Sequence, residues 1–374
     1  MTYPAEFESI RPFVDEELPA AMQRIVSHPS FPSVAKFIYP NEPVEQVVQR
    51  LLALKTIKDF QLHTMKDVLQ RVIKQSITEF SWEGTDYLQP GKSYLFVSNH
   101  RDIVLDAFLL QQILDGIGMP PCHITFGANL MQHPMIIDAG KCNKMFRVDR
   151  GGTLKSFYHS LKLVSSYIRF VISSLNESVW IAQRNGRTKD GIDGTEASLI
   201  KMLAMSGSED DITNLETLNI VPVSVSYEWE PCDSLKAIEL SLRQNGNYEK
   251  APDEDVRSIL TGIRQPKGRT HIAINKPITK DDLLSYSRKD GDFYKWVASL
   301  VDKRIFASYK LFPNNYIAHD LRDHSTRFAN LYTPYQKTQF MERLQQIMSN
   351  PAFDQKAKMI YIGIYANPVD ASLT

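Results

Sequence analysis

From about residue 86 onward, short apolar runs alternate with segments of helical periodicity, and this alternation limits the folds open to the chain. Ile103–Leu114 is almost wholly apolar, as expected of a buried helix, and residues 154–171 repeat apolar side chains at the spacing of an amphipathic helix. Strands that alternate with helices predict an α/β fold, here a mixed, mostly parallel central sheet flanked by helices. The expected strands are Tyr94–Ser98, His123–Gly127, Met145–Asp149, Val179–Ala182, Ile220–Tyr227 and His271–Asn275.

The two ends of the chain have a different pattern. The N-terminal part is predicted to be helical, because Val44–Phe80 carries apolar residues at helical spacing. The polar segment Asp253–Gly268 contains Gly and Pro and is interpreted as a surface excursion, and Met359–Tyr365 is one further candidate strand in an otherwise helical C-terminal part. We therefore expect an N-terminal helical region 1–85, an α/β domain 86–280 and a mainly helical C-terminal extension 281–374 packed on it.

The charge balance argues against one broad class of function. Lys plus Arg and Asp plus Glu both number 43, so the formal net charge is zero and binding to nucleic acid through bulk charge is not expected.

The three cysteines form no CxxC pair, which disfavours a disulfide framework and fits a reducing compartment. No apolar run reaches the roughly 18 residues of a membrane span, and the acidic start lacks the apolar core of a signal peptide. Any contact with a membrane is therefore expected to be peripheral.

A polar cluster follows the first of these strands. Asn99, His100, Arg101 and Asp102 stand between that strand and the next helix, which carries Asp106 near its start. Ligands bind preferentially at such strand ends in α/β sheets, and a histidine oriented by a carboxylate can take a proton near neutral pH. Alternatively, Asp102 caps the helix and His100 is a satisfied polar residue at a strand end. The local string supports both interpretations equally.

The same string matches the His-Arg-Asp motif of protein kinases. In that interpretation the catalytic-loop Asn would fall at Ala107, no Gly-rich loop precedes the motif, and no Asp-Phe-Gly follows it. We therefore discount a kinase.

A basic segment surrounds the strand expected at Met145–Asp149. Lys141, Lys144, Arg147 and Arg150 bracket this strand, and two glycines then lead into a helix. Arginines at a Gly-rich helix entrance suit a phosphate group. A solvated basic edge is the more common meaning of such a run.

A second basic segment follows the strand Val179–Ala182. The polar, glycine-containing turn carries Arg184, Arg187 and Lys189, which again suits an anion at a strand end. The alternative is a flexible turn without a ligand.

Together with Asn219–Tyr227, where Pro222 indicates an edge or a bulge, these segments form an ordered set. In this order and at these separations they resemble the glycerol-3-phosphate and lysophosphatidic acid acyltransferase family, and the resemblance covers about residues 86–280. Arg269–Ile278 is similar to the closing strand of that family. Two departures stand out: one residue more than usual separates His100 from Asp106, and Arg184 stands in the basic turn where the family has Glu.

The resemblance implies an enzyme that transfers a fatty acyl group in one step from acyl-CoA or acyl-carrier protein to the hydroxyl of a glycerol-phosphate or lysophospholipid acceptor. It implies His100 as general base and Asp106 as the residue that orients it, with Asp102 as the second candidate. The implied substrate-binding residues are Asn99, Arg101, Arg147, Arg150, Gly186, Arg187, Thr188 and Lys189. No metal or other cofactor is implied. Because such acceptors are lipids, we expect a cytoplasmic protein at the inner face of a membrane.

Two further hypotheses remain open from the sequence. The unusual spacing and the missing Glu would also suit a non-catalytic protein that binds lipid or acyl-carrier protein, although such a protein has little need of His100. A thioester hydrolase would use the same base with water in place of an acceptor. Cys142 as a nucleophile is less attractive, because the sequence places no base beside it.

Overall fold

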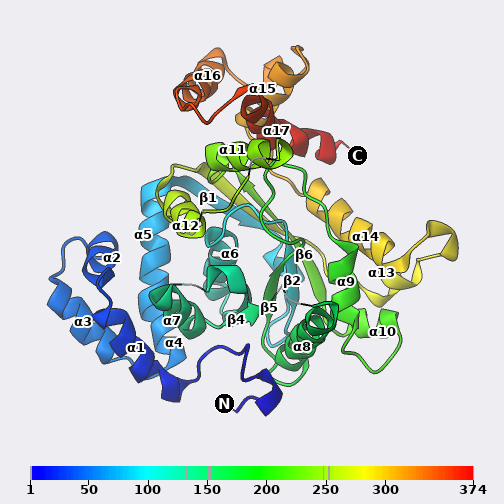
Figure 1. Ribbon diagram of the computed structural model, residues 1–374. Helices are drawn as coiled ribbons and strands as arrows, with labels where there is room; N and C mark the ends of the chain where they lie inside the picture. Colours follow the sequence, from blue (N-terminus) through cyan, green and yellow to red (C-terminus); the bar gives the residue numbers. More distant parts are fainter. Residues whose placement is uncertain are drawn as a thin grey trace.

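The computed structural model describes residues 2–131, 133–149, 151, 153–246, 248–251 and 253–373. A seven-stranded sheet lies at the centre, with strand order β1-β7-β6-β2-β5-β3-β4 (Figure 1). Its strands are β1 (Ile77–Glu83), β2 (Leu95–Ser98), β3 (His123–Gly127), β4 (Met145–Val148), β5 (Val179–Ala182), β6 (Ile220–Tyr227) and β7 (Gly268–Ile274).

The strand directions confirm the predicted fold class. All neighbouring strands are parallel except β6 and β7, which are antiparallel. Strand β1 is parallel to β7 and therefore also runs opposite to the other five strands. The central strand β2 pairs with β6 on one side and β5 on the other, and all four of its residues are buried. All six strands expected from the sequence are present, with bounds that differ by three residues at most.

Helices cover both faces of the sheet. They are α1 (Leu18–Ser27), α2 (Phe31–Ile38), α3 (Val44–Leu52), α4 (Ile57–Phe60), α5 (Lys66–Ser76), α6 (Leu105–Gly116), α7 (Pro134–Cys142), α8 (Leu154–Ser173), α9 (Ala197–Ala204), α10 (Asp211–Glu216), α11 (Asp233–Gln244), α12 (Glu254–Arg264), α13 (Lys280–Leu284), α14 (Phe293–Ala307), α15 (Pro313–Arg322), α16 (Pro334–Met348) and α17 (Gln355–Ser372). Among the described residues, none of these helices combines the length and apolarity needed to cross a membrane.

The alternation of side chains along β2 divides the core into two parts. Leu95 and Val97 pack with residues of α8, α9 and α14, whereas Phe96 packs with residues of α6 on the other face. Figure 1 shows the same division, with α8, α9 and α14 on one side of the sheet and α5, α6 and α7 on the other. The sheet is therefore buried on both faces, as expected of mainly parallel strands.

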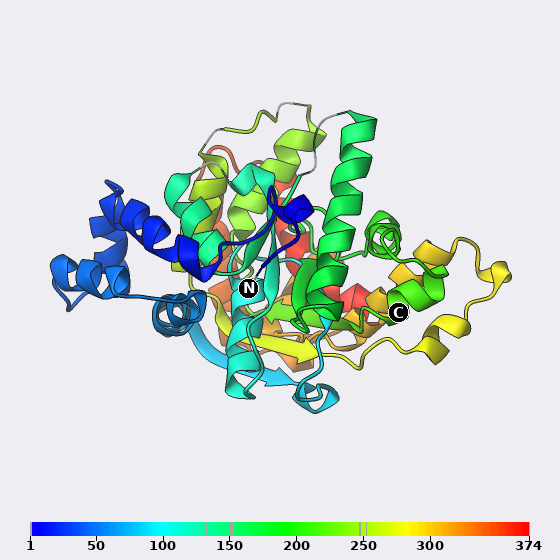
Figure 2. The same cartoon turned by 90° about the horizontal axis from the view of Figure 1, so that it is seen from below.

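The N-terminal helices form a lobe at one edge of the molecule (Figures 1 and 2). Leu18, Met22, Phe31 and Leu51 build a core of their own there, to which Cys142 of α7 contributes. Helix α1 is also joined to α7 by a bidentate ion pair, in which Arg24 Nη2 lies 2.6 Å from Asp138 Oδ1.

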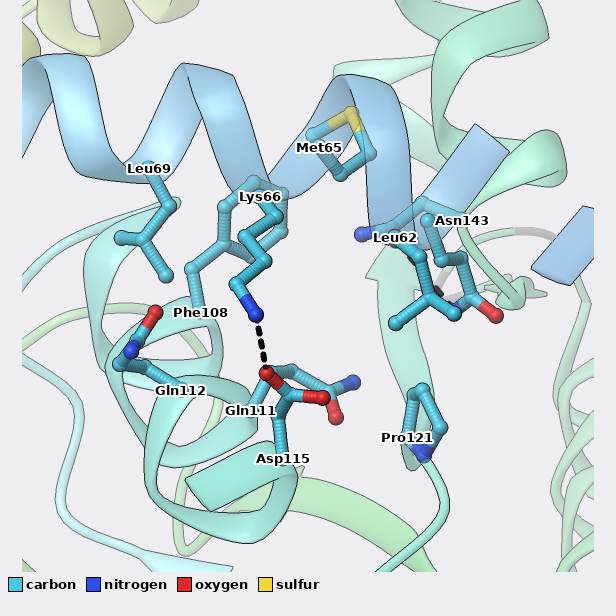
Figure 3. A pocket seen from close by; sticks show the side chains of 11 residues that line it. Leu62, Met65, Lys66, Leu69, Phe108, Gln111, Gln112, Asp115, Pro121 and Asn143 are labelled. Carbon is cyan, nitrogen blue, oxygen red and sulfur yellow. Dashed lines mark hydrogen bonds and ion pairs between the residues drawn. The ribbon is translucent and has the colours of Figure 1, made fainter. Parts of the chain in front are cut away.

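Helix α5 then brings the chain back to the body of the molecule. It starts after a π-helical turn at Gln61–Met65 and lies beside α6. Lys66 Nζ donates to Asp115 Oδ2 at 2.7 Å beside a small cavity of about 50 Å³ (Figure 3). The ion pair joins α5 to the end of α6, and the cavity is too small for a substrate.

Three sequence interpretations are wrong. Ile77–Glu83 is strand β1, although the helical periodicity was extended to Phe80; parallel pairing with β7 overrides the local pattern at this partly exposed sheet edge. Met359–Tyr365 lies in α17 and not in a strand, because short apolar runs do not distinguish a strand from a buried helix. Asp253–Gly268 is mostly helix α12, which packs against α5. The division of the chain at residues 85 and 280 stays a prediction.

Candidate active site

The carboxyl ends of the parallel strands β2, β3 and β5 open into a cleft of about 410 Å³. Its lining includes His100, Phe126, Trp180, Arg187, Lys189 and Arg243. This end of the sheet is where α/β proteins usually bind ligands. We refer to this feature as the cleft.

His100 and Asp106 form the only His–carboxylate contact that lines the cleft among the described residues. His100 Nδ1 lies 2.9 Å from Asp106 Oδ2. The imidazole is 14% exposed, whereas the carboxylate is fully buried. A buried carboxylate at Nδ1 favours the tautomer with the proton on Nδ1, which leaves Nε2 as the proton acceptor. The imidazole ring also meets the Trp180 ring edge to face, with centroids 5.6 Å apart.

Asp106 sits in the first turn of α6, where backbone N–H groups point at it. Its Oδ2 accepts hydrogen bonds from Arg101 N at 2.6 Å and Asp102 N at 2.9 Å, and its Oδ1 accepts from the Tyr227 hydroxyl at 2.9 Å. The extra residue between His100 and Asp106 is accommodated here, because the loop curls around the carboxylate. Three donors besides the imidazole therefore fix the carboxylate that contacts His100.

Asp102 has a different position. Its Oδ1 accepts from the backbone N–H groups of Val104 and Leu105, so it caps the start of α6. Its other oxygen packs against Gly262 of α12, where a Cβ atom would lie 2.3 Å away. Of the two candidate partners, Asp106 is the one in contact with His100.

Asn99 ties the end of β2 to β6. Its amide donates to Val225 O at 3.1 Å and its Oδ1 accepts from Val225 N at 2.7 Å. Asn99 is fully buried and does not line the cleft. The side chain therefore holds the strand ends in register beneath His100.

Arg101 belongs to a buried ionic network and not to the cleft lining. Its guanidinium contacts Asp193 at 2.6 Å and Glu230 at 3.3 Å, and Lys236 contacts Glu230 from α11. Burial acts to lower the pKa of Arg101, but the charges of Asp193 and Glu230 raise it well above its ordinary value. The network fixes the backbone next to His100, since Lys236 Nζ also donates to Arg101 O at 2.6 Å.

The turn after β5 supplies the basic wall of the cleft. Thr188 N donates to His100 O at 3.0 Å, which joins this turn directly to the histidine. Gly186 lies beside it with φ +74°, a conformation that glycine adopts without strain. Gly186, Arg187 and Lys189 all line the cleft, whereas Thr188 is buried behind it.

The cleft cations differ in their partners. Lys189 pairs with Glu239 Oε1 at 2.7 Å, and burial lowers its pKa against the opposing effect of Glu239. Arg243 pairs with the same carboxylate at 2.8 Å. Among the described cleft residues, Arg187 is the cation that pairs with no carboxylate, and its Nη1 is buried without a hydrogen-bond partner. Arg187 is therefore the cation best prepared to receive an anionic ligand.

The comparison with protein families finds one match, which includes most of the residues described above. Residues 79–225 match the family model described as Acyltransferase. This segment is an acyltransferase domain. The match overlaps the segment 86–280 in which the sequence resembles glycerolipid acyltransferases, and His100, Asp106, Arg187 and Lys189 all lie within the matched residues.

Other comparisons are more distant. Among solved structures, the chain is similar to the 1-acyl-sn-glycerophosphate (LPA) acyltransferase PlsC from Thermotoga maritima, with 11% sequence identity and a TM-score of 0.37 over 77% of this chain and 92% of that chain. This likeness is too weak to support conclusions about residues or substrates. No curated protein matches the sequence.

One basic residue expected at the site, Arg147, does not line the cleft. Arg147 is an exposed side chain on β4 that pairs with Asp149 at 2.7 Å. Arg150 lies outside the described residues. Arg184, which replaces the family's Glu, donates to Ile192 O at 3.2 Å and does not line the cleft.

Sequence reasoning missed the residues that come from outside the acyltransferase domain. Glu239 and Arg243 of α11 and Glu254 and Asp255 of α12 line the far wall of the cleft. Their spacing is typical of the solvent-exposed face of a helix, so no local sequence signal identifies them as cleft residues. Tyr227 ends a strand that was expected, but its contact with Asp106 spans 121 residues of sequence.

Metal ligation and a nucleophilic Cys142 can be compared with the geometry of the described residues. Among the described residues, no group of three or more His, Cys, Asp or Glu side chains is arranged to hold a metal ion. Cys142 is fully buried in the core of the N-terminal lobe, and burial raises the pKa of its thiol.

Proposed function

We propose that the protein transfers a fatty acyl group from a thioester, acyl-CoA or acyl-carrier protein, to the hydroxyl of a glycerol-phosphate or lysophospholipid acceptor, with His100 as general base. The observation that carries this proposal is the His100–Asp106 pair, partly exposed at the cleft of an acyltransferase domain. A partly exposed imidazole backed by a buried carboxylate is the usual arrangement for removing a proton from a hydroxyl.

The proposed reaction proceeds through one tetrahedral intermediate. His100 Nε2 takes the proton of the acceptor hydroxyl while the oxygen attacks the thioester carbonyl carbon. The tetrahedral intermediate collapses, the C–S bond breaks, and the thiolate takes the proton from the imidazolium. Asp106 keeps the ring in the required tautomer and stabilises its charged form. The products are an ester and a free thiol, and no acyl-enzyme forms.

The two walls of the cleft suit the two parts of such a reaction. Ile103, Phe126, Leu130 and Trp180 make an apolar wall beside His100 that fits an acyl chain. Arg187 stands on the basic wall without a carboxylate partner and fits the phosphate of an acceptor or donor. Both substrates would thus meet at His100.

The location of the protein is part of the same proposal. Because glycerolipid acceptors reside in membranes, we propose that the protein binds peripherally at the cytoplasmic face of a membrane. Flotation of the full chain with phospholipid vesicles tests this, and failure to float at any vesicle composition would contradict it.

Donor and acceptor assays test the reaction itself. Purified protein is incubated with labelled acyl-CoA or acyl-carrier protein, with and without glycerol 3-phosphate, lysophosphatidate or acylated amino-acid lipids, and both free thiol and labelled lipid are measured. Thiol release that depends on an acceptor, with matching ester formation, is expected. Equal release without any acceptor would instead identify a thioester hydrolase, and donor binding without release would identify a binding protein.

A further inference from the structure

The two oxygens of the Asp106 carboxylate have unequal surroundings. Oδ2 faces His100 and also receives two backbone N–H groups, from Arg101 and Asp102. Oδ1 has one donor among the described residues, the hydroxyl of Tyr227 at 2.9 Å. Because the carboxylate is fully buried, no solvent would replace that donor.

Tyr227 is built into the fold at a fixed position. It ends β6, two residues after Val225, which both donates to and accepts from the Asn99 amide. The ring is 5% exposed and packs in the core that includes Phe96 and Leu105. Its hydroxyl is therefore aimed at Asp106 by two strands that also place His100.

The phenol stays a donor over the range in which an enzyme works. Burial and the charge of Asp106 raise the pKa of Tyr227 well above its ordinary value. The hydroxyl therefore keeps its proton, and its hydrogen bond to Asp106 persists at any moderate pH.

We infer that Tyr227 is a positioning residue for the proposed acyl transfer: by holding Oδ1 of Asp106, it keeps Oδ2 directed at His100 and limits the negative charge that reaches the imidazole. The inference rests on the proposed role of His100. Tyr227 does not line the cleft, so it acts through Asp106 and touches no substrate.

The hydrogen bond from Tyr227 to Asp106 has two separable effects on His100. Without the phenol, the carboxylate can rotate about its side-chain bonds, and the imidazole loses its fixed orientation. More negative charge is then left on the carboxylate oxygens, which strengthens their hold on the imidazole proton. A general base that must be neutral then becomes active at a higher pH.

Other charges surround this chain of hydrogen bonds, and none changes when Tyr227 becomes Phe. The loop before α6 contributes Arg101 and Asp102, and the connection from β6 to α11 contributes Glu230. Helix α11 contributes Lys236 and Glu239, and the segment before β7 contributes Lys267. The basic turn contributes Arg187 and Lys189. Since Tyr227→Phe removes a hydrogen bond but no charge, a shift in the titration of His100 reports that bond alone.

The test compares Tyr227→Phe with Tyr94→Phe. Tyr94 is a buried tyrosine of the same core, and its hydroxyl accepts from Gln89 N at 2.8 Å, away from Asp106. For Tyr227→Phe we expect kcat to fall roughly 10-fold at its pH plateau with KM within twofold of wild type, and the midpoint of kcat/KM against pH to rise by about half a unit. Tyr94→Phe should keep both the plateau and the midpoint.

An independent measurement does not require activity. NMR titration of the imidazoles, nine in all, with His100 assigned by comparison with His100→Ala, should show the same upward shift for His100 in Tyr227→Phe. In an Asp106→Asn background, Tyr227→Phe should add no further loss of kcat. A His100 titration and a rate profile that match wild type in Tyr227→Phe would overturn the inference. If wild type transfers no acyl group, the proposed function fails, and the NMR titration still decides whether Tyr227 acts on His100.

Discussion

Arg187 and Lys189 are two residues apart on one turn, yet their charges are available to a ligand to very different degrees. Lys189 shares Glu239 with Arg243, whereas Arg187 has no carboxylate partner among the described residues. A cation that is already paired with a carboxylate must give up that partner before it binds an anion, whereas a cation without a carboxylate partner need not. The acceptor's anionic group should therefore depend chiefly on Arg187.

For Arg187→Ala, the KM for a phosphate-bearing acceptor should rise roughly 10- to 100-fold, because a charge-assisted hydrogen bond is lost. The kcat should change much less, since Arg187 is not expected to touch the reacting oxygen. Steady-state kinetics at varied acceptor concentration measures both constants. Arg327→Ala, at an exposed arginine of the C-terminal part, serves as the control. An unchanged KM in Arg187→Ala would remove Arg187 from the acceptor site.

At this scale the sequence predicts the residues that lie within one motif. His100, Asp106, Arg187 and Lys189 follow strands whose ends meet, so their place in the site could be inferred from local patterns. Arg101 shows the limit of that reasoning: its position in the motif suggested a ligand contact, but two distant carboxylates, Asp193 and Glu230, hold its guanidinium. Contacts across more than 90 residues leave no trace in a local string.

At the scale of elements, the C-terminal helix α17 holds the turn that carries Arg187 and Lys189. Asn367 Nδ2 donates to Asp190 O at 2.7 Å. Gly191 packs so closely on α17 that a Cβ atom would lie 2.4 Å from Ile364 O. The basic turn of the acyltransferase domain thus depends on a helix far outside that domain.

Gly191→Ala should disturb this contact. The new Cβ atom meets backbone at a residue with φ +79°, so the turn and α17 must separate. We expect the free energy of unfolding to fall by roughly 2–4 kcal/mol, and acyl transfer to fall with it. Gly118→Ala has a similar φ of +75° with no atom near its Cβ, and should lose only about 1–2 kcal/mol. Urea unfolding measures both, and equal losses would show that the contact with α17 is unimportant.

The strands and helices were largely predictable where the apolar sequence pattern is long or has clear ends. The bounds of β3, β5 and β6 match the strands expected from the sequence, because most residues of these strands are buried. Strand β1 and the apolar part of α17 were not predictable, because pairing with β7 and packing against α15 decide their conformation. Such tertiary contacts are absent from a single sequence.

At the scale of the whole molecule, the amino end of the sheet is held by a partly buried ionic group distant from the cleft. Glu177 contacts His123 Nε2 and Lys144 Nζ, each at 2.7 Å, and so joins the starts of β3 and β5 to the turn before β4. Burial alone would raise the pKa of Glu177, but the hydrogen bond from His123 and the charge of Lys144 outweigh it and lower the pKa to about 2. The folded state therefore prefers the ionised carboxylate.

This preference predicts a pH dependence of stability. A carboxyl whose pKa is lower in the folded chain stabilises it above the unfolded pKa of about 4.3, and the contribution is lost as the pH falls toward 2. At pH 7, Glu177→Gln should lower the free energy of unfolding by about 2–3 kcal/mol, and the difference from wild type should shrink between pH 4.5 and roughly 2. Glu342→Gln, at an exposed position of α16, is the control. A difference that is constant with pH would contradict the assigned ionisation of Glu177.

The central claim is that His100 acts as the base in acyl transfer, and its most direct test is the rate of acceptor-dependent ester formation in His100→Ala. His159→Ala, at an exposed histidine of α8, is the matched control, and circular dichroism checks that both variants fold. We predict that kcat/KM falls roughly 10²- to 10⁴-fold in His100→Ala and stays at the wild-type value in His159→Ala. A folded His100→Ala variant that transfers acyl groups at the wild-type rate would contradict the account.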